Sequence, residues 1–192
     1  MIGIACLIAL QVIGCAGGPL RALVSTQAGS DAAITGQYLN NEFGYGTTVP
    51  KSVAAHPASG LAAKHGFVID LHVNPRAYLW VDGSRNDQGW KSFDDAVSAR
   101  IDDIKEAGGI HIVVLEKERT HLAGLRALRC TLRYDTSDSR DPTVQELVVA
   151  FRKIDTGVDL VYTIGLTAPE WLRARHHKLI EEIKKTWKLR PL

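Results

Sequence analysis

The residues with the best spacing for metal chemistry are His177 and Glu181, four positions apart near the end of the chain. On a helix this spacing puts both side chains on one face, where an imidazole nitrogen and a carboxylate could share a cation. His176 would point about 100° away, toward the apolar side. A solvated hydrogen bond or ion pair is the commoner role of such a pair. Both interpretations stay open, with His177 and Glu181 as the candidate ligand or metal site.

Other titratable residues form weaker candidates. His72 and His111 fall in two expected strands and could face each other across a sheet, although a structural role is the simpler interpretation. Asp94-Asp95 and Asp102-Asp103 share an expected helix, where they would cap it and solvate its outer face. General acid–base chemistry would require a cleft around them, which no pattern in the sequence indicates.

Three arginines make up a candidate partner surface. Arg129 and Arg133 lie on the same face of an expected strand, and Arg126 lies at its end. Such a basic strip would suit an anionic partner. The alternatives are a solvated strand face or a face covered by a helix.

Several kinds of chemistry lack their motifs. The chain has no G-x-S-x-G nucleophile elbow and no phosphate-cradling glycine loop. A net charge of +2 without a basic, aromatic-rich stripe argues against a nucleic-acid partner. Of the three cysteines, Cys130 lies on the inward face of an expected strand and would serve as a small core side chain. The sequence therefore predicts no catalytic residue and no cofactor.

The chain opens with an apolar leader that ends in a cysteine. Residues 1–14 carry no charge, and an apolar run this short fits a signal-peptide core better than a span of about 20 residues. Val12-Ile13-Gly14-Cys15 resembles the lipobox of bacterial lipoproteins, in which the cysteine receives lipid and becomes the first residue. The alternative is a buried N-terminal strand with an ordinary cysteine.

The lipobox resemblance implies where the protein would reside. It implies lipid on Cys15 and anchoring of the chain to a membrane of the bacterial cell envelope. In a Gram-negative host, Ala16 after the cysteine would imply the periplasmic face of the outer membrane. Residues 15–40 are rich in Ala, Gly, Ser, Thr and Gln, which is typical of a flexible tether. The folded domain is then expected over residues 41–192.

The first half of this domain is expected to alternate short strands with loops. Ser92 and Asp95 form a capping-box pattern at the start of a helix that Gly108-Gly109 would end. The other expected elements are a short strand before Pro50, a loop over 51–64, strands over 66–73 and 77–81, a polar turn over 82–89 and a strand over 110–115.

The second half gives the clearest pattern. Apolar residues alternate over 128–134, 145–151 and 158–166, which predicts three antiparallel strands with one face toward the core and one toward solvent. Gly157 suits the turn of the hairpin. Thr167, Pro169 and Glu170 then form a helix-start pattern. The helix would bury one apolar stripe against the sheet: Leu172, Leu179, Ile180, Ile183 and Trp187.

These elements predict an α+β fold, with an antiparallel sheet of about six or seven strands packed with two main helices. The order of parts, with FGYGTTVP, LAGLRALRCTLRY, VVAFR and DLVYTIGL before a closing helix, resembles the PsbP-like superfamily, which includes DcrB-like bacterial lipoproteins. The resemblance covers about residues 41–189. It implies an α/β sandwich used for assembly or binding and supplies no catalytic residues.

Two functions remain as hypotheses. The first is a lipid-anchored envelope protein whose non-catalytic domain binds or scaffolds another envelope component. The second is an envelope enzyme or small-ligand receptor, with a pocket between the sheet and loop 51–64 that gathers His56, His65 and Asp87.

Overall fold

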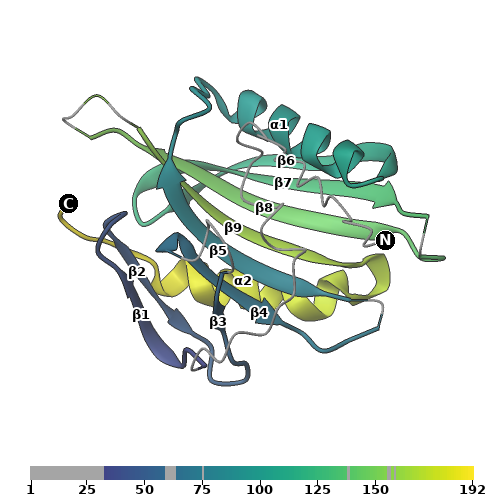
Figure 1. Ribbon diagram of the computed structural model, residues 1–192, viewed down its shortest axis with the longest axis horizontal. Helices are drawn as coiled ribbons and strands as arrows, with labels where there is room; N and C mark the ends of the chain where they lie inside the picture. Colours follow the sequence, from purple (N-terminus) through teal and green to yellow (C-terminus); the bar gives the residue numbers. More distant parts are fainter. Residues whose placement is uncertain (1–32, 59–63, 75, 138, 155–156, 158) are drawn as a thin grey trace, which may run out of the picture.

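The computed structural model describes residues 33–58, 64–74, 76–137, 139–154, 157 and 159–192 (Figure 1). The expected signal peptide, Cys15 and the tether up to residue 32 lie outside the described residues. Within the described part, no helix is long and apolar enough to cross a bilayer.

A seven-stranded antiparallel sheet forms the centre of the domain (Figure 1). The hairpin expected from the alternating pattern supplies its middle, and Gly157 has the positive φ of +80° that its turn needs. The strands, in spatial order, are β3 (His56–Pro57), β4 (Gly66–Asp70), β5 (Tyr78–Arg85), β9 (Leu160–Pro169), β8 (Thr143–Arg152), β7 (Leu125–Asp135) and β6 (Ile110–Leu122).

A smaller sheet joins the two ends of the domain. It has the order β1 (Gly36–Asn40), β2 (Tyr45–Val49) and β10 (Lys188–Leu189). The tether expected up to residue 40 is therefore wrong at its C-terminal end. Asn40 donates to the Lys64 carbonyl at 2.8 Å, and the Tyr38 ring packs edge-on against Phe67 at 5.0 Å. These long-range contacts hold a segment whose polar composition indicated a flexible chain.

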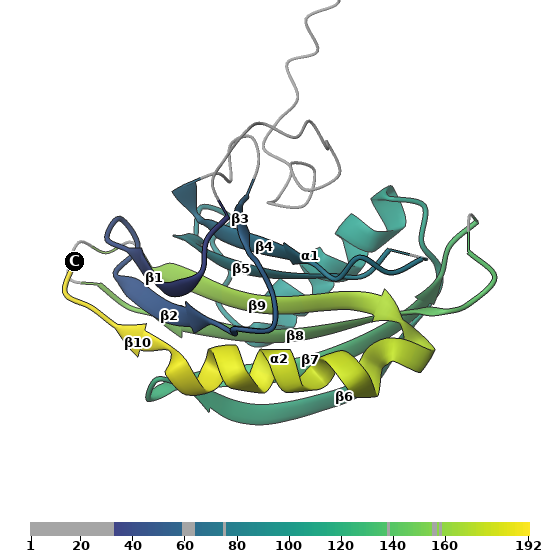
Figure 2. The ribbon, with the colours of Figure 1, turned by 90° about the horizontal axis from the view of Figure 1, so that it is seen from below.

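One helix covers each face of the large sheet (Figures 1 and 2). α1 (Phe93–Glu106) packs on the face that carries Leu147 and Val149 of β8, whereas α2 (Arg173–Thr186) packs on the face that carries Val148 and Ala150. The α+β fold class is thereby confirmed. The expectation that one face of the hairpin meets solvent is wrong, because the second set of side chains in β8 is also buried, with Val144, Val148 and Ala150 in it, and a helix covers each set.

α1 begins and ends where the sequence indicates. The Ser92 hydroxyl accepts from the Asp95 amide, and the Asp95 carboxylate accepts from the amides of Ser92 and Lys91 at 2.9 and 2.8 Å. These two backbone hydrogen bonds lower the pKa of Asp95 below its usual value. Gly108, with φ of +89°, follows the last turn.

α2 begins later than its helix-start pattern predicts. Thr167 is buried in β9 and its hydroxyl accepts from the Gln145 amide at 2.8 Å, so this residue does not cap the helix. A 3₁₀ turn over Glu170–Leu172 separates β9 from α2, and neither start has a side-chain cap. The predicted apolar stripe is confirmed, since Leu172, Leu179, Ile180, Ile183 and Trp187 are all buried.

Two strands extend beyond their predicted ends. β5 runs on to Arg85, so Asp82 is a buried strand residue rather than part of a polar turn. β6 runs on through the charged residues 116–119 to Leu122. Polar side chains are tolerated there because β6 lies at the outer edge of the sheet and faces water.

Candidate functional site

A cluster of charged side chains is enclosed between α2 and the large sheet. Its centre is the fully buried carboxylate of Glu146, from β8. His177 Nδ1 lies 2.9 Å from Glu146 Oε1, Arg129 Nε lies 3.5 Å from the same oxygen, and Arg173 Nε lies 3.8 Å from Oε2. Arg129 also bonds Glu181, in the next turn of α2. We call these five residues the Glu146 cluster.

The Glu146 cluster is internally paired rather than open. A buried carboxylate is tolerated when positive groups and hydrogen bonds surround it, and here β7 and α2 supply both. His177 and Glu181 lie on one helix face as predicted, but they bond different partners: Glu146 for His177, and Arg129 and Lys184 for Glu181. Among the described residues, no group of three or more His, Cys, Asp or Glu side chains could hold a metal ion. The arrangement joins helix to sheet.

The three arginines of the candidate partner surface have different surroundings. Arg129 lies in the Glu146 cluster, and Arg133 Nε lies 3.1 Å from Glu170 Oε2. Arg126 is exposed next to the β6–β7 turn. Two of the three therefore hold the elements around α2 in place, and the trio as a partner surface stays a prediction.

The other sequence candidates are dispersed. His72 follows β4 and His111 lies in β6, with four strands between them in the sheet, so the expectation that they face each other is wrong. Each lies beside an aspartate instead, His72 at 3.7 Å from Asp70 and His111 at 3.0 Å from Asp135. The register of distant strands cannot be read from two isolated histidines.

The acidic pairs of α1 also have structural partners. Asp94 pairs with Lys117 of β6 at 2.7 Å, and Asp102 pairs with Lys105 at 3.0 Å within the helix. Asp103 lies 3.6 Å from Arg100. These ion pairs stabilise α1 and join it to β6, which fits the structural role that the sequence predicted for the two acidic pairs.

A second buried polar group, which was not among the candidates predicted from the sequence, lies beneath α1. The Arg100 guanidinium lies 5.1 Å from the Trp80 ring centre and bonds Gln145, whose amide donates to Thr167. Burial lowers the pKa of Arg100 below its usual value. A small hollow of about 50 Å³ adjoins Arg100, with Asp82 and Asp103 in its lining. The signal in the sequence was an arginine on the apolar side of a helix, where cations are rarely found.

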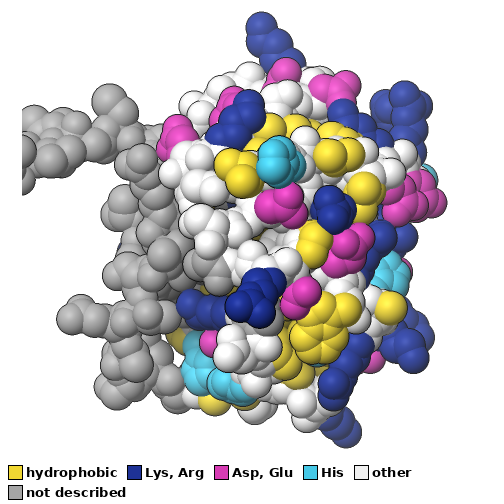
Figure 3. All heavy atoms as spheres, turned by 90° about the vertical axis from the view of Figure 1, so that its right-hand side faces the viewer, with side chains coloured by type: hydrophobic (Ala, Val, Ile, Leu, Met, Phe, Trp, Pro, Cys, Tyr) yellow, Lys and Arg dark blue, Asp and Glu magenta, His cyan; other side chains and the backbone are white. Residues whose placement is uncertain are grey.

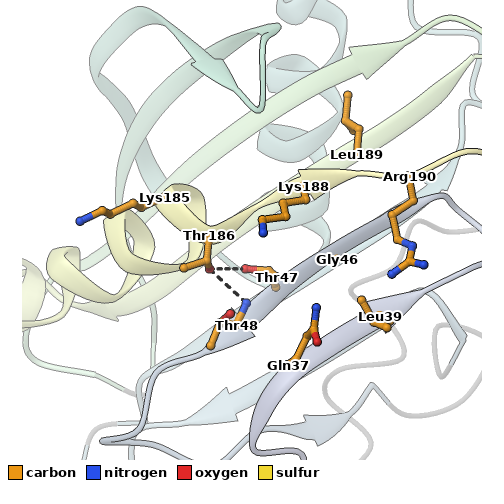
Figure 4. Close-up of a pocket in the computed structure, with 10 residues that line it drawn as sticks. All are labelled: Gln37, Leu39, Gly46, Thr47, Thr48, Lys185, Thr186, Lys188, Leu189 and Arg190. Carbon is orange, nitrogen blue, oxygen red and sulfur yellow. Dashed lines mark hydrogen bonds between the residues drawn. The ribbon is translucent and has the colours of Figure 1, made fainter.

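A larger hollow, of about 340 Å³, lies on the outer face of the small sheet (Figure 4). Its lining combines cations and neutral polar groups with two leucines: Lys185, Lys188, Arg190, Gln37, Thr47, Thr48, Thr186, Gly46, Leu39 and Leu189. No sequence pattern indicates this hollow, because its residues come from two distant segments, positions 37–48 and 185–190.

In the described part of the chain, the polar groups proposed for a pocket beside loop 51–64 do not lie together. His56 is exposed in β3 and Asp87 is exposed in a turn, while His65 Nδ1 lies 3.6 Å from Asp82. Neither of the two hollows is lined by residues 51–58 or 64–65.

The surface is otherwise a mixture of charges with apolar patches. On the side drawn in Figure 3, acidic, basic and histidine side chains alternate with several apolar ones. Four of the large apolar side chains that are exposed belong to β6: Ile110, Val113, Val114 and Leu115. Trp171, in the 3₁₀ turn before α2, is 61% exposed.

The fold and the paired polar groups define a three-layer α+β domain whose enclosed charges are used for packing. No family model matches the chain, and a search of curated proteins found no match. Solved structures do share the fold. The chain is similar to LpqN, described as involved in cell envelope biogenesis of Mycobacterium tuberculosis, with 14% identity and a TM-score of 0.57 over 84% of this chain and 91% of that one.

Two further structures support the same conclusion. The cyanobacterial PsbP protein (CyanoP) of Synechocystis sp. PCC 6803 has 14% identity and a TM-score of 0.56, over 86% of this chain and 98% of that one. The Ran-binding protein Mog1p of Saccharomyces cerevisiae has 12% identity and a TM-score of 0.51, over 82% and 96%. At such identities the likeness concerns the fold alone. The expected PsbP-like fold is confirmed.

Proposed function

We propose that this chain is a lipid-anchored protein of the bacterial cell envelope whose non-catalytic domain binds an extended segment of another envelope protein along β6. One observation carries the binding role. β6 is an outer strand of thirteen residues whose first half exposes apolar side chains, from 39% of Val114 to 52% of Ile110.

An outer strand presents a row of unpaired backbone donors and acceptors, which invites another strand to pair with it. Charges and bulges usually protect such edges from pairing with another strand. In β6 the protective charges are unevenly distributed, because residues 116–119 are all charged, whereas residues 112–115 carry no charge. Register irregularities occur on both sides of Val113-Val114.

Strand addition suits these features. Backbone hydrogen bonds supply affinity in this mode of recognition, and alternate side chains supply specificity. The apolar residues of β6 would meet apolar side chains of the incoming segment. Glu116, Lys117 and Glu118 already pair with Arg173, Asp94 and Arg129, which leaves Arg119 to fix the register by pairing with an acidic side chain of the incoming segment.

The envelope location is supported by two independent features. Val12-Ile13-Gly14-Cys15 resembles a lipobox, and lipid on Cys15 would tether the domain to the membrane. The similar structure LpqN is described as involved in cell envelope biogenesis. A non-catalytic role agrees with the names of LpqN, CyanoP and the Ran-binding Mog1p, none of which denotes an enzyme.

Site-specific photocrosslinking in the native host tests the binding role. A photoreactive residue in place of Val113 should yield a crosslinked envelope protein, whereas the same residue in place of the exposed Ser98 of α1 should not. Adding Val114→Lys should abolish the Val113 product, because a charge would enter the apolar contact. Equal products from both positions, or a crosslink between two copies of this chain, would contradict the proposal.

Membrane fractionation tests the anchor separately. Cys15→Ser should remove the lipid acceptor and leave an unlipidated chain whose N-terminus can be read by mass spectrometry. Unchanged mass and fractionation compared with the unsubstituted protein would show that Cys15 carries no lipid. The crosslinking result does not depend on this outcome.

A further inference from the structure

The register of the small sheet collects side chains on its outer face. Lys188 of β10 lies opposite Gly46 of β2, and Gly46 lies opposite Leu39 of β1. Gln37 lies opposite Thr48. Because directly opposed residues of antiparallel strands point to the same side, these five positions share one face.

Gly46 opens the floor of the hollow. A Cβ atom there would lie 2.8 Å from the Leu39 Cδ2 atom and 3.0 Å from the Tyr38 carbonyl oxygen. With hydrogen in its place, a hollow of about 340 Å³ remains between Leu39, Lys188 and the end of α2 (Figure 4). This volume lies within the lower range of small-molecule sites, which begins at roughly 300 Å³.

The wall formed by the end of α2 is held in place by hydrogen bonds. The hydroxyls of Thr47 and Thr186 lie 2.9 Å apart, and the Thr186 hydroxyl accepts from the Thr48 amide at 3.0 Å. Thr47 also donates to the Ile183 carbonyl at 2.9 Å. This last bond occupies one of the helix-end carbonyls that would otherwise repel an anion.

The charge in the hollow has one sign. Lys185, Lys188 and Arg190 are exposed, and none of the ion pairs found between described residues includes them. The lining contains no aspartate or glutamate. In Figure 4 the side chains of Lys188, in β10, and Arg190, just after it, extend over the same face from which Gln37 rises, whereas Lys185 points away along the helix. This differs from the Glu146 cluster, where each cation has an acidic neighbour.

We propose that this hollow binds the phosphate group of a phosphate ester, with Arg190 and Lys188 on the phosphate oxygens and Leu39 against the adjoining carbon chain. A phosphate has several acceptor oxygens and a charge that one cation does not neutralise. The guanidinium fork of Arg190 fits two of these oxygens, and the Lys188 ammonium supplies a point charge. The Gln37 amide and Thr48 hydroxyl can donate further bonds.

Two sources can present this chemistry: a soluble phosphate ester, or the headgroup of an anionic membrane lipid. The rate at which acetic anhydride modifies each lysine distinguishes them, because a bound phosphate raises the pKa of a nearby ammonium and lowers its reactivity. One pKa unit corresponds to about a tenfold lower rate. The full chain is used, and Lys178 on the exposed face of α2 serves as the internal reference.

The first arm adds sn-glycerol 3-phosphate in solution, and the second adds phosphatidylglycerol vesicles, with phosphatidylcholine vesicles as the comparison. Slowing of Lys188 by about tenfold relative to Lys178 is expected in at least one arm. Slowing with glycerol phosphate identifies a soluble ester. Slowing on phosphatidylglycerol alone identifies a lipid headgroup. Insertion of the apolar leader into the membrane does not affect this comparison, because it occurs on both kinds of vesicle.

A matched pair of variants assigns the effect to the hollow. Arg190→Gln should weaken binding by about tenfold or more, because the charge-assisted hydrogen bonds of the guanidinium are lost, and so shift the concentration that protects Lys188. Arg140→Gln removes the same charge from the exposed turn between β7 and β8 and should leave that concentration unchanged. Lys188 reacting like Lys178 in both arms would overturn the proposal, as would an equal effect of the two variants.

Discussion

The two faces of the large sheet are covered by helices of equal length, fourteen residues each, that are held by different means. α1 carries its own start signal in Ser92 and Asp95 and encloses a buried cation, Arg100. α2 has no side-chain cap and encloses a buried anion, Glu146. α1 is thus the helix whose start is clearest from the local sequence. It is also the helix with fewer connections to distant parts of the chain.

Whereas α1 packs on the large sheet, α2 connects the large sheet to the small sheet. On one side it packs against β8 and β9, and beyond its end β10 pairs with β2. Trp187, just after the helix, stacks on Tyr45 at 4.5 Å and meets the Tyr162 ring edge-on at 5.7 Å. Loss of α2 would expose both sheets, and loss of α1 would expose one face.

The largest expected effect comes from a charge placed under each helix. Ile183→Asp should destabilise the fold by about 5 kcal/mol or more, enough to unfold many domains, because this fully buried side chain lies where α2 meets both sheets. Ile104→Asp, in the last turns of α1, should cost about 3 kcal/mol, since its carboxylate can reach water at the helix end. Urea unfolding followed by circular dichroism measures both. Equal losses would remove the asymmetry between the helices.

The buried charges provide a sharper comparison. Glu146→Gln keeps the shape but removes the carboxylate that Arg129 and Arg173 share, at a cost of about 3 kcal/mol, the lower end for a broken buried pair because Glu181 and Glu116 remain as partners. Arg100→Met replaces a buried cation with an apolar side chain of similar length. It strands the side-chain oxygen of Gln145 and removes the ion pair with the partly exposed Asp103, at a cost of about 1 to 2 kcal/mol. The same unfolding experiment applies. A larger loss for Arg100→Met would show that the α1 face depends more on its charge.

Much of the α1 side and the hairpin could be predicted because their signals are local. The Ser92 capping box, the glycines after α1, and the alternation in β8 and β9 depend on residues close in sequence. The start of α2 could not be predicted in this way. Thr167 carries a sound cap pattern, but a hydrogen bond from Gln145, more than twenty positions away, keeps it in β9.

The sites were harder to predict than the fold for the same physical reason. The partners of Glu146 come from β7 and α2, and the residues of the hollow come from β1, β2 and the segment from the end of α2 to Arg190. A charged side chain with apolar residues two positions away on both sides of the strand, as Glu146 has in Val144 and Val148, indicates a buried charge, but the identity of its partners depends on strand order. β10 is two residues long and has no periodic pattern of its own.

A smaller effect is expected at the helix starts. Ser92→Ala should cost about 1 kcal/mol and speed hydrogen exchange of the first amides of α1, because the Asp95 amide loses its acceptor. Thr167→Ala should instead speed exchange in β8 and β9, and leave the first turn of α2 unaffected. Exchange measured by NMR distinguishes these outcomes. Faster exchange at the start of α2 in Thr167→Ala would show that this residue caps the helix after all.

The smallest expected effect concerns two histidines, His65 and His176, whose surroundings shift their pKa values in opposite directions. The carboxylate of Asp82, 3.6 Å from His65 Nδ1, raises the pKa of His65 above 6.5, although partial burial opposes the shift. Burial on the sheet-facing side of α2 lowers the pKa of His176 below 6.5, and the nearby charge of Arg175 lowers it further. In an NMR titration His65 should therefore gain its proton first as the pH falls.

The two shifts have opposite consequences for stability. A raised pKa in the folded state means that His65 stabilises the protein below about pH 6.5, and that this contribution is lost as the pH rises through its folded value. His176 contributes above about pH 6.5, and its contribution is lost as the pH falls toward its lowered value. Asp82→Asn removes the first effect alone, so stability should decline more steeply from pH 8 to pH 5 in this variant than in the unsubstituted protein. Parallel pH profiles would show that Asp82 does not hold the His65 proton.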